Sequence, residues 1–150
     1  MIFGHNAQTK EELIQQVNDG KWNELLHRVK IKPGDFFYVP SGTIHALCEG
    51  TLVLETQQSS DTTYRVYDYD RRDSEGNLRE LHLDKAIDVT TVPHQETGVT
   101  PVVANRENVT MTTFVESEFF SVYKWSIDGN ATFSTDERYL LVSVIDGDGT

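Results

Sequence analysis

The side chain best placed for chemistry in this sequence is His45. It follows two turn signals, Pro33-Gly34-Asp35 and Pro40-Ser41-Gly42, which flank the aromatic residues 36–39. A neutral imidazole in such a position binds a metal ion or accepts a proton. One histidine supplies only one ligand or one base, so its chemistry depends on the residues that join it. By residue type alone, a structural or exposed role is the more common one.

The positive charge of the chain is concentrated further along. Its one dense basic cluster has four arginines within fifteen residues: Arg65, Arg71, Arg72 and Arg79. Taken alone, Arg65 is expected to pair across a sheet face with an aspartate, and three aspartates are candidates: Asp61, Asp68 and Asp70. A run of arginines among aspartates is also typical of a solvated loop.

Composition limits the possible partners and settings. The chain has 150 residues and a net charge of −11, which fits one soluble domain and disfavours nucleic acids and anionic membranes as partners. A locally basic pocket for a small anionic substrate stays compatible with this charge. The single cysteine, Cys48, excludes a disulfide framework, so a cytoplasmic setting is the simplest interpretation. We expect no membrane-spanning helix, and no secretory signal is evident at Met1.

Helical signals come early in the chain. Thr9 and Glu12 form a capping box, and the apolar residues that follow predict a helix that ends at Asp19-Gly20. Two further short helical segments are expected at 22–26 and 82–88.

Most of the remaining chain has strand signals, and the first residues resemble the end of a strand. Strands are expected at 29–32, 36–39, 51–57, 62–69, 109–115, 119–127, 131–133 and 139–145. Asp128-Gly129-Asn130 predicts a hairpin turn, and residues 92–108 are expected to be an irregular linker. Strands spaced about ten residues apart favour an antiparallel sandwich or barrel.

The spacing around His45 resembles a known motif. Gly34, Pro40, Gly42 and His45 have the spacing of the second conserved motif of the cupin family, although Glu49 stands where that motif usually has asparagine. In cupins this histidine is a metal ligand. The first cupin motif, H-x-H, occurs nowhere in the chain.

Two longer segments, 32–46 and 54–71, resemble type I mannose-6-phosphate isomerases in their bacterial form. The resemblance implies a mainly β fold, a cupin-type jelly roll with a short helical insert near the N-terminus. It implies zinc as the cofactor, with His45 as one ligand, and Arg65 as the catalytic arginine. Glu55 and Asp61 match the positions of carboxylates that could move the proton. The implied reaction interconverts mannose 6-phosphate and fructose 6-phosphate through an enediol.

The resemblance also predicts the domain organisation. Residues 1–93 would be part of a catalytic barrel, and residues 94–150 would begin a second, incomplete one. The family's upstream segment, with the other zinc ligands and a lysine, has no counterpart here, so we expect a fragment that is inactive alone. One alternative is a non-catalytic cupin that binds a sugar or a metal, and another is an iron-dependent redox cupin. The expected partner is a small sugar phosphate, and the oligomeric state is left open.

Overall fold

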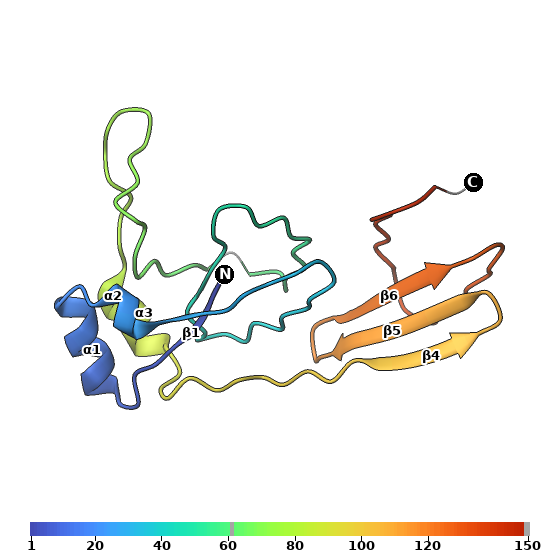
Figure 1. The fold of residues 1–150 in the computed structure, drawn as a ribbon, viewed down its shortest axis with the longest axis horizontal. Coiled ribbons are helices and arrows are strands. Elements are labelled where there is room, and N and C mark those ends of the chain that lie inside the picture. Colours follow the sequence, from blue (N-terminus) through green and yellow to red (C-terminus); the bar gives the residue numbers. More distant parts are fainter. Residues whose placement is uncertain (61, 149–150) are drawn as a thin grey trace.

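Two small antiparallel sheets and three short helices make up the regular structure of the described residues. The computed structural model describes residues 1–60 and 62–148 (Figure 1). In chain order the elements are β1 (Ile2–His5), α1 (Lys10–Asn18), α2 (Trp22–Leu25), β2 (Leu26–Arg28), β3 (His45–Ala46), α3 (Leu83–Val89), β4 (Val102–Arg106), β5 (Val109–Glu116) and β6 (Ser121–Ile127). The mainly β class predicted from the sequence is confirmed.

The first sheet has the strand order β2-β1-β3, so β1 is hydrogen-bonded on both sides. Ile2 pairs with Arg28 on β2, and Phe3 pairs with His45 on β3. All four residues of β1 are buried. The core beside this sheet is formed by Ile2, Ala7, Leu13, Val17, Leu25 and Leu26. The core therefore joins the central strand to α1 and α2.

Helix α1 begins as the sequence predicted. The Thr9 hydroxyl accepts a hydrogen bond from the backbone N–H of Glu12 at 3.1 Å, and the Glu12 carboxylate accepts one from the backbone N–H of Gln8 at 2.8 Å. The first bond satisfies an N–H group that the first turn of a helix leaves without a partner, and the second ties the residue before the cap to the helix. Leu13 and Val17, four residues apart, are the buried face of the helix. The short helices expected near 22–26 and 82–88 correspond to α2 and α3.

The second sheet is a meander with the order β4-β5-β6. β5 and β6 lie where the sequence predicted strands, but β4 lies within 92–108, which was predicted to be irregular. That prediction was wrong because Pro101 and Gly98 masked a short apolar run that pairs with β5 from Val102 to Arg106. An extended segment connects this sheet to α3 (Figure 1). The prediction of a domain boundary at 93/94 stays a prediction.

Several expected strands have no strand structure among the described residues. They are 29–32, 36–39, 51–57, 62–69, 131–133 and 139–145. Strand propensity favours an extended backbone, but a strand also needs a neighbour to pair its N–H and C=O groups. In the part of the chain that the structure describes, these segments form no continuous ladder with a neighbouring strand, although isolated backbone hydrogen bonds join Val29 to Met1 and Arg65 to His82. Apolar side chains of 51–57 and 139–145 are open to solvent, as at Leu52 (99% exposed) and Leu141 (83% exposed), whereas residues 36–39 are partly buried.

Aromatic contacts join the loops of the first half to the second sheet. Phe36 stacks on Phe114 of β5 with ring centroids 4.6 Å apart, and Tyr38 meets Phe120 edge-on at 6.5 Å. The Thr97 hydroxyl donates to the Tyr38 carbonyl at 2.9 Å. The aromatic residues 36–38 therefore act as a packing surface. Among the described helices, none is long and apolar enough to cross a membrane.

We expect Thr9→Ala to destabilise the protein by about 1 kcal/mol, because it removes the side-chain acceptor at the N-terminus of α1. Urea denaturation followed by circular dichroism measures this change. Thr100→Ala is the matched control, since Thr100 is exposed and lies outside the helices and strands. An equal loss of stability in the two variants would contradict the capping role of Thr9.

Candidate active site

His45 lies on β3, whose pairing with the buried β1 fixes its backbone. Its Nδ1 is 3.0 Å from the carbonyl oxygen of Thr43, and its side chain is exposed. A carbonyl oxygen only accepts hydrogen bonds, so the neutral ring carries its proton on Nδ1 in this contact. The Nε2 lone pair is then available to a metal ion, which is the arrangement usual for a ligating histidine.

The turn before His45 is held against the end of α3. Gly42 has φ +81, and a Cβ there would lie 2.6 Å from the Val89 carbonyl oxygen and 2.8 Å from the Thr91 hydroxyl oxygen. The backbone N–H of Thr91 donates to the Gly42 carbonyl at 3.0 Å. Only glycine combines this left-handed backbone with so close an approach. The turn thus fixes the chain three residues before His45.

Arg65 is held by a segment seventeen residues later in the chain. Its backbone N–H donates to the ring nitrogen Nδ1 of His82 at 3.2 Å. In return, the backbone N–H of His82 donates to the backbone carbonyl of Arg65 at 2.8 Å. Its guanidinium Nη1 donates to the Glu80 carbonyl at 3.3 Å, and its side chain is 24% exposed. The guanidinium is therefore supported on one side and partly open to solvent.

Asp68 is the common partner of three arginines. Its Oδ1 forms ion pairs with Arg71, with Arg79 at 3.5 Å and with Arg65 Nε at 4.0 Å. The hydrogen bond from Arg71 lowers the pKa of Asp68, burial opposes that effect, and the charges of the three arginines add to it. The ionised carboxylate therefore stabilises the folded chain at pH values above its ordinary pKa of 3.8. This stabilisation is lost as the pH falls through the lower pKa that Asp68 has in the folded state.

The other predicted site residues are not joined to this arrangement. Glu55 is exposed in an irregular segment, and Asp61 lies outside the described residues. Within residues 1–60 and 62–148, no hydrogen bond or ion pair links His45, Glu55 and Arg65. The same residues contain no group of three or more His, Cys, Asp or Glu side chains able to hold a metal ion. His45 is thus a single potential ligand.

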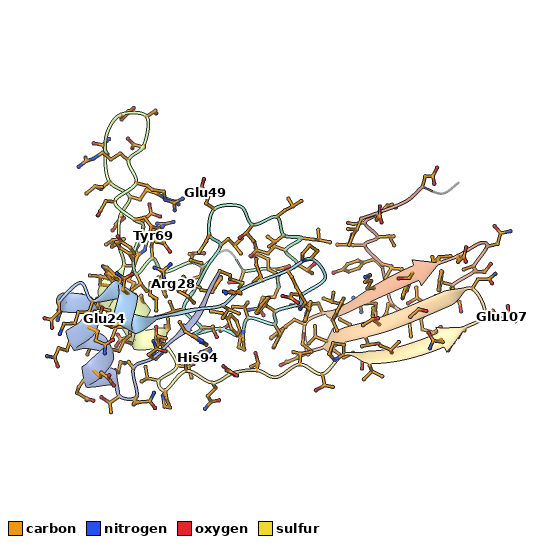
Figure 2. All side chains as sticks on the ribbon, viewed as in Figure 1. Glu24, Arg28, Glu49, Tyr69, His94 and Glu107 are labelled. Carbon is orange, nitrogen blue, oxygen red and sulfur yellow. The ribbon has the colours of Figure 1, made fainter. Side chains whose placement is uncertain are left out.

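Surface hollows lie elsewhere. Two are formed at the turn between β4 and β5, near Glu107, which Figure 2 shows at the tip of the second sheet. None of His45, Glu55 or Arg65 lines either hollow. We assign no function to them.

Two other histidines, His5 at the end of β1 and His94, lie close together. His5 Nε2 is 2.9 Å from the Thr91 carbonyl oxygen, and the His5 and His94 ring centroids are 6.1 Å apart. Figure 2 shows His94 close to β1, where its ring meets Phe3 edge-on. Burial, and then the proximity of His5, lower the pKa of His94. The lowered pKa favours the neutral form of the His94 ring, which packs as an aromatic side chain against Phe3 and His5.

The sequence pattern did not predict the support that His82 gives to Arg65, and it left Asp68 as one of three possible partners. The Arg65–Asp68 spacing of three residues was the only available signal. The contacts from His82 and Glu80 depend on how the intervening loop folds back, which local sequence does not specify.

The comparisons with known proteins agree with the motif. The family description "Mannose-6-phosphate isomerase, cupin domain" matches residues 110–150. Over 149 residues the chain is 56% identical to mannose-6-phosphate isomerase ManA of Bacillus subtilis (strain 168), covering 99% of this chain and 47% of that protein. The chain is thus similar over nearly its whole length to mannose-6-phosphate isomerases. The identity to the mannose-6-phosphate isomerase of Streptococcus mutans is 50% over the same length and the same shares.

A solved structure is similar to this chain in fold as well as in sequence. The crystal structure of the mannose 6-phosphate isomerase from Bacillus subtilis matches with a TM-score of 0.83 and 59% identity, covering 85% of this chain and 41% of that one. The predicted relationship to these isomerases is confirmed. The chain spans about half the length of the curated relatives that it matches.

We expect Gly42→Ala to destabilise the protein by about 2–4 kcal/mol, because an added Cβ would meet the Val89 carbonyl and strain the backbone. Gly50→Ala is the matched control: Gly50 has a similar φ of +78 but open space around it. That variant should lose only about 1 kcal/mol, from backbone strain alone. Urea midpoints at constant m-value measure both. Equal losses would show that the contact with α3 contributes nothing.

Proposed function

We propose that this chain supplies part of the active site of a zinc-dependent aldose-ketose isomerase that interconverts mannose 6-phosphate and fructose 6-phosphate. The observation that carries the proposal is the supported, partly exposed guanidinium of Arg65 in a chain 56% identical to ManA. A cytoplasmic setting belongs to the same proposal and rests on the use of a single cysteine.

The reaction moves one proton between adjacent carbons. A base removes the C2 proton of the open-chain aldose, and the electron pair shifts to give an enediolate with negative charge on oxygen. Delivery of a proton to C1 and transfer of the O2 proton to O1 give the ketose. The Arg65 guanidinium stays charged throughout, so it stabilises the developing oxyanion without giving up its own proton. Glu55 and Asp61 are the two candidates for the base.

Among the described residues, His45 is the one predicted zinc ligand. The contact of His45 Nδ1 with Thr43 leaves Nε2 suited to the metal, but the described residues provide no set of three ligands. A zinc ion at His45 would need further ligands. When bound, zinc supplies a Lewis acid that polarises the sugar carbonyl.

We expect the isolated chain to bind zinc weakly, because one histidine does not hold the ion without co-ligands. Competition against a zinc indicator, followed by metal analysis after dialysis, measures the affinity and the stoichiometry. His45→Ala should remove the weak binding that remains, while the control His27→Ala should not. One tightly held zinc per chain that persists in His45→Ala would contradict the assignment of His45.

A chimera tests the proposed activity. In it, this chain replaces the matched segment of Bacillus subtilis ManA, and the conversion of mannose 6-phosphate is followed by a coupled assay. We expect an active chimera in which Arg65→Ala lowers kcat about 10²- to 10³-fold, the range for losing one oxyanion-stabilising donor. Arg138→Ala, which removes an exposed arginine outside the helices and strands, is the control.

The outcomes separate the alternatives. Unchanged turnover in Arg65→Ala would remove the catalytic role of Arg65. A folded chimera that binds zinc and the sugar phosphate without turnover would instead favour a non-catalytic cupin. Oxygen-dependent activity with bound iron would favour a redox cupin.

A further inference from the structure

We propose that Asp68 is the positioning residue for the Arg65 guanidinium, an inference that rests on the proposed function for its catalytic meaning. Asp68 is only 6% exposed, and its Oδ1 is shared by Arg65, Arg71 and Arg79. It acts on Arg65 directly, through the ion pair, and indirectly, through the loop that follows.

The indirect route runs through the base of the loop at 70–80. Arg71 and Arg79 lie at the two ends of this loop, and both pair with Asp68, so the carboxylate ties the ends together. An isolated antiparallel bridge between Arg72 and Leu78 lies just inside them. The loop extends away from the helices as a long projection (Figure 1). Among the described salt bridges, Arg71 and Arg79 pair with no other carboxylate than that of Asp68.

The residues that hold Arg65 follow directly after the loop. Arg79 is next to Glu80, whose carbonyl accepts from Arg65 Nη1, and His82 exchanges two hydrogen bonds with the Arg65 backbone. By holding Arg79, Asp68 therefore helps to position the following residues, Glu80 and His82, which hydrogen-bond to Arg65. Figure 2 shows Tyr69, the residue after Asp68, at the base of the same projection.

The arrangement of charges around Asp68 allows this carboxylate to position Arg65 without fully neutralising its guanidinium. Three guanidiniums share one carboxylate, so the single negative charge of Asp68 does not by itself balance all three positive charges. Arg71 makes the close hydrogen bond, whereas Arg65 Nε lies at the longer distance of 4.0 Å. Among the described hydrogen bonds, the Arg65 side chain donates through Nη1 alone. Its charge thus stays available to an oxyanion.

The burial of Asp68 argues against an incidental surface pair. Its Oδ2 is buried without a hydrogen-bond partner in the described structure. Removing an ionised carboxylate from water costs free energy, which nearby cations offset. An ion pair on the exposed surface stays solvated and does not carry this desolvation cost. The arrangement is therefore consistent with a role in holding the three arginines in place.

An NMR experiment tests the inference without any need for activity. In the intact chain, the Nε–H resonance of Arg65, assigned with Arg65→Lys, reports its surroundings and its exchange with water. We expect Asp68→Asn to shift this resonance and to accelerate its exchange at least severalfold. Asp73→Asn is the matched control, because it makes the same change within the loop, where Asp73 accepts from the Glu75 and Asn77 N–H groups. A folded Asp68→Asn variant with an unchanged Arg65 resonance would overturn the inference.

If Asp68→Asn does not fold, a second variant tests the same inference. Arg79→Gln keeps the carboxylate and removes only the link to the far end of the loop. It should shift the same resonance, and an unchanged signal in this variant would overturn the indirect route.

In the active chimera, we expect Asp68→Asn to lower kcat about 10- to 100-fold with a smaller change in KM. It should add little to the loss already caused by Arg65→Ala, because both changes act on one guanidinium. A full additive loss would show that Asp68 acts on something other than Arg65. An inactive wild-type chimera would count against the proposed function, while the NMR result would still decide the positioning role.

Discussion

The pairing of β1 with strands on both of its sides is the constraint on which the first half of the chain depends. A buried backbone must satisfy its N–H and C=O groups, and β1 does so with β2 on one side and β3 on the other. The neighbour on the second side carries His45. The same strand that completes the core thus delivers the candidate ligand, so the stability of the core and the position of the imidazole are coupled.

Local sequence predicted the elements whose signals are local. The capping box marked α1, and strand signals bounded by turn residues marked β5 and β6. It failed where pairing is non-local: β4 was hidden by nearby proline and glycine, and extended segments such as 51–57 have no strand neighbour among the described residues. Propensity specifies the backbone conformation of a segment, whereas a strand also requires a partner distant in sequence.

The candidate site was predictable to a similar extent. Turn spacing singled out His45, and the family resemblance singled out Arg65. The contacts of Asp68 and His82 with Arg65 became visible only in the folded chain, because a loop must close before residues 79–82 meet Arg65. Glu55 gained no contact that distinguishes it as a base, and Asp61 lies outside the described residues.

The exposed segment at 139–145 has a consequence for the behaviour of the chain in solution. Its sequence, YLLVSVI, is uncharged and rich in β-branched and aromatic residues, with Leu141 83% and Ile145 76% exposed. Such a segment is a template for intermolecular cross-β pairing. Arg138 and Asp146 flank it as charged gatekeepers, and the net charge of −11 adds long-range repulsion between chains. Added salt screens that repulsion, so the colloidal stability of the protein falls as ionic strength rises.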